Sequence, residues 1–280
     1  MPGRKVISSG LVAGLWLSAG GLSAQAERIP LAAHRAIYEL ALDPNKTTTR
    51  VDTARGRIAF EMNGNACDGY SVSLRQVTEL DTGEGKQTTS DLRSTTWEGG
   101  DAKSFRFKNQ NFVNRELRDD VDGTADKGVD GGLSVKLAKP KTPPLSIGGP
   151  VLLPTEQLTK ILERGEAGEH LLEAKVYDGS PDGKKVYETL SVIGGAIAGA
   201  SGDLEEVVRS GPLSSIKRYP VTVSYFDSTE GTGERTPAYT LTFELYENGV
   251  SRALKLDYGS FALKGDLKSV EFLKTAPCKK

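Results

Sequence analysis

Hydrophobic and polar residues alternate with a period of two along most of this chain. Ile58, Phe60 and Met62, for example, are separated by single residues of another character. Such alternation is typical of half-buried strands, with one face on a core and the other in water. We therefore expect about fourteen strands, mainly antiparallel. The clearest runs are 57–62, 70–75, 103–109, 132–138, 171–177, 185–192, 219–226, 238–246, 252–258 and 268–273, and the less regular ones are 33–42, 88–97, 112–118 and 203–208.

Turn sequences separate these runs. Asn248-Gly249 lies between two alternating stretches, and Asn-Gly is the strongest short hairpin signal. Residues 178–183 and 227–233 are predicted to be longer hairpin loops, and the acidic, glycine-rich residues 119–132 a solvated loop. Gly259 indicates a bend or bulge in a strand.

One segment has helical rather than strand periodicity. The pattern predicts a helix over Thr155–Arg164, with Leu158, Ile161 and Leu162 in an i, i+3, i+4 stripe. Thr155 is a suitable N-cap, and Gly165 can end the helix. Because the stripe is narrow, the helix must pack on the sheet or plug an opening in it. The sequence leaves both arrangements open.

The N-terminus has the features of a secretory signal peptide. Arg4 and Lys5 precede a long apolar stretch, and Ala24 and Ala26 form a small-x-small cleavage site. We expect removal of residues 1–26 and export to the periplasm. No later apolar run approaches the roughly 20 residues of a membrane-spanning helix, so we expect no transmembrane segment in the mature chain.

The chain has two cysteines, Cys67 and Cys278. In an oxidising compartment an even number of cysteines indicates a disulfide, and two cysteines allow one pairing. The bridge would close a loop of about 210 residues, which the chain-entropy model values at up to about 5 kcal/mol. The alternative, two buried free thiols, is disfavoured because Cys278 lies in a polar tail.

Charge and composition exclude some classes of protein. The chain carries 36 Lys and Arg against 37 Asp and Glu. This balance lacks the basic excess of a nucleic-acid-binding protein.

The sequence contains no local motif for catalysis or metal binding. His34 and His170 are far apart and outside any zinc-binding pattern. An EF-hand loop starting at Asp120 or Asp122 would lack both the sixth-position glycine and the twelfth-position glutamate. No nucleophile elbow or phosphate-binding glycine motif occurs. We therefore expect no catalytic residue, metal or cofactor, although a pair of glycan-cleaving carboxylates would leave no local motif.

Aromatic residues at expected inward strand positions are the remaining candidates for a binding site. A long, curved antiparallel sheet can enclose an apolar cavity that suits an acyl chain. The alternative is that these residues are ordinary core. The candidates are Trp97, Phe105, Phe107, Tyr225, Phe226, Tyr239 and Phe243.

Several stretches across nearly the whole mature chain match one family in the family's order. They are His34–Tyr38, Cys67–Tyr70, Thr96–Asp101, Leu153–Thr155, Val176–Ser180, Tyr219–Phe226, Leu245–Arg252, Leu256–Gly259 and Cys278. In these stretches the chain resembles the EipB-like cell-envelope integrity proteins, which are periplasmic β-spiral proteins of Gram-negative bacteria.

The resemblance implies a fold and a role. The fold would be a spiral-like, many-stranded broken β-barrel formed by residues 27–280 as one domain and closed by a disulfide between Cys67 and Cys278. The role would be non-enzymatic support of envelope integrity and stress resistance, by binding a periplasmic protein partner or an apolar ligand. A lipid or lipoprotein carrier, similar in shape to lipoprotein chaperones, is an alternative, and an envelope hydrolase a less favoured one. The family has no established activity, so no catalytic residue is carried over.

Overall fold

A computed structural model describes residues 29–46, 51–83, 87–199, 201–227 and 235–278. Within them, fifteen strands form one sheet in the order β8-β7-β6-β5-β4-β3-β2-β1-β15-β14-β13-β12-β11-β10-β9. The predicted signal peptide, residues 1–26, and most of the predicted loop 227–233 lie outside the described residues.

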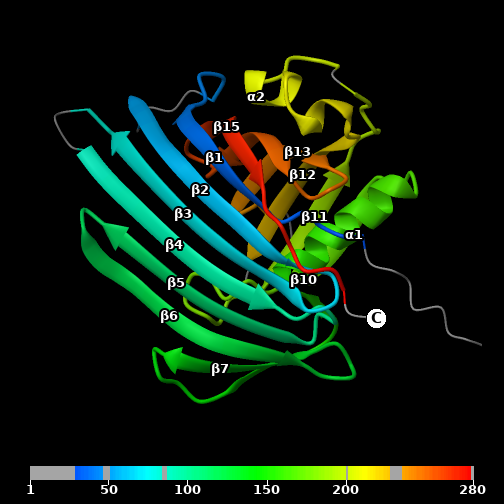
Figure 1. The fold of residues 1–280 in the computed structure, drawn as a ribbon. Coiled ribbons are helices and arrows are strands. Elements are labelled where there is room, and N and C mark those ends of the chain that lie inside the picture. The colour runs from blue at the N-terminus through cyan, green and yellow to red at the C-terminus, as the bar shows by residue number, and fades with distance from the viewer. Residues whose placement is uncertain (1–28, 47–50, 84–86, 200, 228–234, 279–280) are drawn as a thin grey trace, which may run out of the picture.

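The sheet is antiparallel except where β9 pairs in parallel with β10. It curves into a broken barrel, with β2–β7 along one side and β10–β15 along the other (Figure 1). The first and last strands, β1 and β15, pair in the middle of the sheet. The strands are β1 His34–Leu42, β2 Thr53–Asn65, β3 Gly69–Asp81, β4 Gln87–Glu98, β5 Ser104–Val113, β6 Glu116–Lys127, β7 Leu133–Lys139, β8 Leu145–Ile147, β9 Val151–Leu152, β10 Leu171–Val176, β11 Tyr187–Ile193, β12 Arg218–Asp227, β13 Tyr239–Tyr246, β14 Ser251–Asp257 and β15 Ala262–Phe272; the helices are α1 Pro154–Glu166, α2 Glu206–Arg209 and a 3-10 helix at Pro212–Ser215.

The period-two pattern corresponds to the two faces of the sheet. In β7, Leu133, Val135 and Leu137 are buried, whereas Ser134 and Lys136 between them are exposed. This is the geometry of a pleated strand with one face on a core. Together with the strand order and the helix α1, this pattern confirms the expected mainly antiparallel, many-stranded broken barrel with a short helix.

The prediction of a solvated loop at residues 119–132 was wrong. Most of it belongs to β6, which pairs with both β5 and β7. Val121 and Ala125 are buried on the inner face, while acidic residues such as Asp122 and Asp126 alternate with them on the other face. The acidic composition therefore marks a solvated strand face.

The prediction of a strand at residues 203–208 was also wrong. Here the chain forms α2, and Leu204 and Val208 pack into the core beside Leu213. Leu204 directly precedes the N-cap Glu205, Val208 lies within the helix, and both side chains face the core. The predicted strand at 268–273 is the second half of the longer β15.

The helix α1 exists, with shifted ends. Leu153, not Thr155, is the N-cap, and Gly165 lies inside the helix, against the ring of Tyr219. The chain leaves the helix through Gly168, whose φ of 72° suits glycine. No helix among the described residues combines the length and hydrophobicity needed to cross a membrane.

Among the described residues, the core consists of three clusters of buried side chains. One lies beneath α2 and includes Leu204 and Val208. The second surrounds Ile161 and Leu162 of α1, and therefore places the helix inside the curve of the sheet. The third fills the end formed by β5–β7 and includes Phe105.

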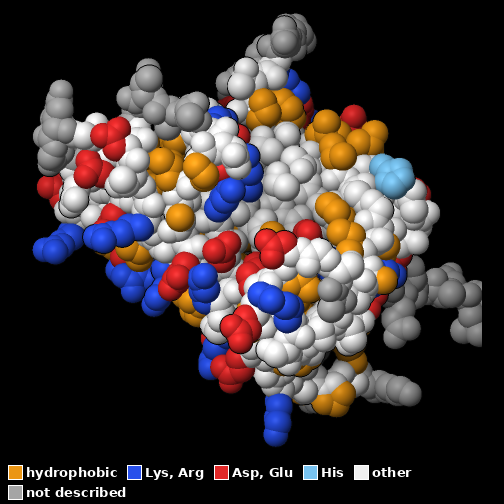
Figure 2. Space-filling view, turned by 90° about the horizontal axis from the view of Figure 1, so that it is seen from above, with side chains coloured by type: hydrophobic (Ala, Val, Ile, Leu, Met, Phe, Trp, Pro, Cys, Tyr) orange, Lys and Arg blue, Asp and Glu red, His pale blue; other side chains and the backbone are white. Residues whose placement is uncertain are grey.

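Charged side chains lie mainly on the outside. Acidic and basic groups are interspersed on the face seen from above (Figure 2). Some pair across neighbouring strands, as Arg35 does with Glu61 at 2.6 Å.

Candidate apolar binding site

An apolar cavity lies between α1 and the inner faces of both walls of the barrel. Its volume is about 320 Å³. Its lining residues come from β1–β3 on one side, from β12–β14 on the other and from α1. They are His34, Tyr38, Ile58, Phe60, Met62, Val72, Leu74, Gln76, Pro154, Thr155, Gln157, Leu158, Ile161, Val223, Tyr225, Leu241, Phe243, Gly249, Ser251, Leu254 and Leu256.

The lining follows directly from the strand pattern. Most of the contributing strands supply residues two apart, such as Val72 and Leu74 on β3, because alternate side chains point to the same face. The helix supplies Leu158 and Ile161, three apart on one helical face. The same alternation that predicts the strands therefore also defines the cavity wall.

The polar groups of the wall are uncharged, and several are already hydrogen-bonded. The Tyr38 hydroxyl donates to the carbonyl of Ser251 at 2.8 Å. The Gln157 amide donates to the Thr189 hydroxyl at 3.2 Å. Burial lowers the pKa of His34, whose Nδ1 lies 2.7 Å from the carbonyl oxygen of Ala32. None of the lining residues is Asp, Glu, Lys or Arg, so the cavity favours an uncharged, apolar occupant.

The N-terminus of α1 is held by the buried carboxyl group of a residue on β4. Glu98, at the end of β4, accepts the backbone N–H groups of Thr155 and Glu156 at 2.8 and 2.9 Å. Burial raises the pKa of Glu98 to about 7, against the effect of these hydrogen bonds. Glu156 in turn pairs with Lys127 of β6 at 2.5 Å. These contacts hold the start of α1, which forms one side of the cavity, against β4 and β6.

The seven aromatic candidates do not form one group. Tyr225 and Phe243 line the cavity, and Tyr239 stacks on Tyr225 with ring centroids 4.3 Å apart. Phe105 and Phe107 belong to the separate core cluster near β5–β7.

The other two candidates face outward. Trp97 lies under the guanidinium of Arg106 and Phe226 under that of Arg235, at 5.0 and 5.4 Å from the ring centroids. Whether any of the seven contacts a ligand stays a prediction.

About half of the cavity-lining residues are aliphatic, and none of these was among the candidates. The alternating runs at 57–62 and 70–75 contain five of its residues, four of them aliphatic, so inward aliphatic positions were a usable signal. His34 and Gln157 carried no such signal, because only the tertiary structure brings β1 and α1 together.

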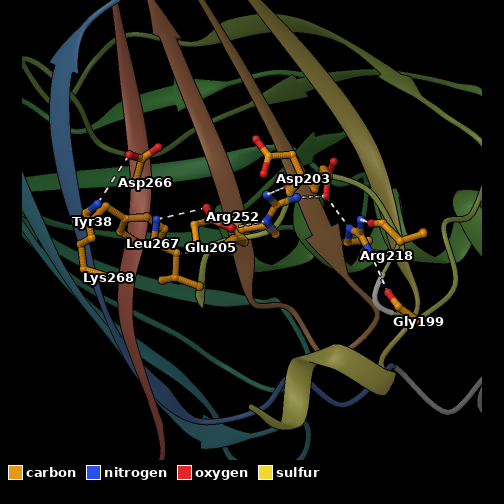
Figure 3. A network of polar contacts seen from close by, with 12 residues as sticks. Tyr38, Gly199, Asp203, Glu205, Arg218, Arg252, Asp266, Leu267 and Lys268 are labelled. Atoms are coloured by element: carbon orange, nitrogen blue, oxygen red, sulfur yellow. Dashed lines mark hydrogen bonds and ion pairs between the residues drawn. The ribbon is translucent and has the colours of Figure 1, made fainter. Parts of the chain in front are cut away.

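At one end of the barrel, a buried ion-pair network holds the segment before β12 (Figure 3). Glu244 accepts from both Arg218 and Arg252, and Glu205 binds Arg252 at 2.6 Å. Arg218 also donates to the carbonyls of Gly199 and Ser201 at 3.0 and 2.6 Å.

This network gives no support to a hydrolase. Its carboxylates are bound by guanidinium groups, whereas a glycosidase needs two carboxyl groups free to flank a substrate. Glu98 and Glu156 also lie close together, but both are engaged at the start of α1. In the described part of the chain, no cluster of His, Cys, Asp and Glu could hold a metal ion.

Comparison with known proteins establishes the relationship. The family model described as EipB-like matches residues 25–274. The chain belongs to the EipB-like family. It is 36% identical over 268 residues to the cell envelope integrity protein EipB of Brucella abortus (strain 2308), covering 96% of this chain and 94% of that protein.

A solved structure agrees with this assignment. The EipB-like chain superposes with a TM-score of 0.77 and 36% identity on the crystal structure of a β-barrel-like protein of a domain of unknown function from Brucella abortus. The match covers 87% of this chain and 99% of that chain. At this identity the likeness reflects common descent as well as shape.

The EipB-like fold is closed by the expected disulfide. Cys67, in the turn between β2 and β3, is bonded to Cys278 of the C-terminal tail, with Cα atoms 5.6 Å apart. The amide of Asn65 also donates to the carbonyl of Ala276 at 3.2 Å, which holds the tail against the same turn.

Proposed function

We propose that this EipB-like protein supports cell-envelope integrity from the periplasm by binding the hydrocarbon part of an amphiphilic ligand. The observation that carries the proposal is the neutral, apolar cavity between α1 and the two walls of the sheet. Its volume of about 320 Å³ lies at the lower end of the range of roughly 300–1,000 Å³ for small-molecule sites. Apolar cavities exclude water and accept apolar molecules.

The envelope role is supported by the relative that bears the name cell envelope integrity protein. The predicted signal peptide and the disulfide both support an oxidising compartment outside the cytoplasm. A carrier that passes a lipid or lipoprotein acyl chain to another protein is one form of this proposal. It needs no catalytic residue, in keeping with a non-enzymatic protein.

Filling the cavity tests the proposal. Leu74→Trp places a bulky ring in the cavity, whereas Ser73→Trp places the same ring on the outer face of the same strand. We expect the uncharged dye N-phenyl-1-naphthylamine to bind the parent protein and Ser73→Trp with equal affinity, and Leu74→Trp at least tenfold more weakly. Fluorescence titration measures this, with thermal melting to confirm that both variants fold. Equal binding by all three proteins would rule out this cavity as the site.

The envelope role has its own test in cells. Loss of the gene is expected to sensitise cells to detergent and to inhibitors of cell-wall synthesis, and Ser73→Trp to restore growth. Failure of Leu74→Trp to restore growth would connect the cavity to the role. Unchanged sensitivity after gene loss would contradict the envelope role, whatever the dye titration shows.

A further inference from the structure

The strand β10 has an open edge. It pairs with β11 along its whole length, but on its other side β9 pairs only with Lys175 and Val176. Residues 171–174 therefore have no strand beside them among the described residues. This edge lies outside the apolar cavity described above.

The backbone direction along β10 follows from one hydrogen bond. The N–H of Ile193 donates to the carbonyl of His170 at 2.8 Å, so His170 faces β11. Because bonding direction alternates along an antiparallel ladder, Leu172 and Ala174 also face β11. The N–H and C=O groups of Leu171 and Glu173 consequently point to the open edge. They are the polar groups of an incomplete sheet.

A hollow of about 630 Å³ lies along this edge. It is bordered by Glu173 and Lys175 of β10, by Leu152 of β9 and by Lys160 of α1. An exposed strand edge is one of the geometries in which proteins accept an added peptide strand.

The side chains along the edge indicate what would fit. Leu171 and Val192 are direct cross-strand partners and are 58% and 46% exposed, which makes them an apolar pair in water. Glu173 follows two residues after Leu171 on the same exposed face and has no ion pair within the described residues. Lys175, the next residue on that face, is already flanked by β9.

We propose that an extended segment of a partner polypeptide adds to the sheet as a strand beside Leu171–Ala174. Its backbone satisfies the open N–H and C=O groups of Leu171 and Glu173. It carries an apolar side chain beside Leu171 and, two positions away, a Lys or Arg beside Glu173, because opposite charges in direct cross-strand positions are favourable. This site is independent of the apolar cavity.

A second copy of the chain fits this edge poorly. If two β10 edges paired antiparallel, Glu173 would face either Glu173 or Leu171 of the other copy. The first arrangement opposes like charges and the second sets a carboxylate against an apolar side chain. The charge and hydrophobicity of the edge therefore favour a different partner.

Proline at position 173 tests the open edge. Glu173→Pro removes the N–H that points outward and leaves the bonds of Leu172 and Ala174 to β11 in place, which is where proline is tolerated in a sheet. Glu173→Ala keeps the N–H and serves as the control. The probe is a phage-displayed library of random heptapeptides, panned on the full mature protein with its disulfide intact.

We expect enrichment of peptides with an apolar and a basic residue two positions apart. They should bind Glu173→Pro at least tenfold more weakly than the parent, and Glu173→Ala only a few-fold more weakly. Hydrogen exchange on the unmodified protein should show new protection of the amides of Leu171 and Glu173 when peptide is bound, which does not depend on how the variants fold.

Three outcomes would overturn the proposal. They are no enrichment of peptides, protection of amides elsewhere in the protein, and a concentration-dependent dimer that Glu173→Pro abolishes, which would identify a second copy as the occupant. Dye binding in the cavity is expected to be unchanged in both variants, so failure of this proposal and failure of the proposed function can be distinguished.

Discussion

Glu98 shows how one residue connects two distant parts of the chain. It ends β4, yet its carboxylate accepts the first backbone N–H groups of α1, more than fifty residues later in sequence. Four N–H groups at the start of a helix lack internal partners, and the two carboxyl oxygens of Glu98 satisfy two of them. Glu98 thus accepts, from a distant strand, the helix N–H groups that a side-chain cap at Thr155 was predicted to satisfy.

The raised pKa of Glu98 predicts a pH dependence of stability. The folded protein holds the Glu98 proton up to about pH 7, whereas an unfolded chain loses it near its ordinary value of 4.5. The contribution of Glu98 to the free energy of unfolding is therefore fully present below pH 4.5 and is lost as the pH rises toward 7. At 1.36 kcal/mol for each pKa unit, the loss is about 3 kcal/mol.

Glu98→Gln should remove this decrease, because Gln does not ionise. Urea unfolding of both proteins at pH 5 and pH 8 measures the difference. His34 titrates in both proteins, so its contribution cancels in the comparison. Equal changes with pH in the two proteins would show that Glu98 is ionised throughout.

At the scale of elements, the segment before β12 is fixed by charge as well as by packing. Arg252 is 5% exposed and binds Glu205, Glu244 and the carbonyl of Asp203. This joins the chain near α2 to β13 and β14. The apolar side chains of Leu204 and Val208 pack on the same side of the sheet.

Removing Arg252 should cost far more stability than removing a surface arginine. Arg252→Ala leaves the half-buried carboxylates of Glu205 and Glu244 without one of their partners, and breaking a buried pair in this way costs up to about 3–5 kcal/mol. Arg55→Ala breaks the Arg55–Glu79 pair, whose arginine side chain is 81% exposed, and should cost about 1 kcal/mol or less. Chemical denaturation measures both. Similar losses would mean that the network is hydrated and contributes little.

For the whole molecule, the disulfide is the longest-range covalent constraint. It joins residues 211 apart in sequence and ties the β2–β3 turn to the C-terminal tail. Such a loop restricts the unfolded chain, with an upper value of about 5 kcal/mol.

Cys278→Ser should therefore lower the melting temperature by several degrees or more and make the protein sensitive to protease. Melting the parent protein with and without reductant provides the matched measurement. Equal melting of oxidised and reduced protein would show that the bridge contributes nothing to stability.

The sequence by itself determined the class of fold, most of the strands, the helix and the disulfide. These depend on local periodicity and on a cysteine count of two. It failed where local composition pointed away from the tertiary environment, since β6 looked like a loop through its acidic outer face and α2 looked like a strand through its apolar residues. The broken-barrel shape was predicted only from the resemblance to the EipB-like family, because local patterns do not specify how the sheet curves.

Only the tertiary structure decided what the inner face encloses. Strand alternation shows that Val72 and Leu74 point inward, but not that they face Leu158 of α1 across an open space. Glu98 at the start of α1 and the unpaired edge of β10 are equally invisible in sequence. The physical reason is the same in each case: periodicity fixes which side of its own element a residue faces, whereas register, curvature and chain crossings fix what lies opposite.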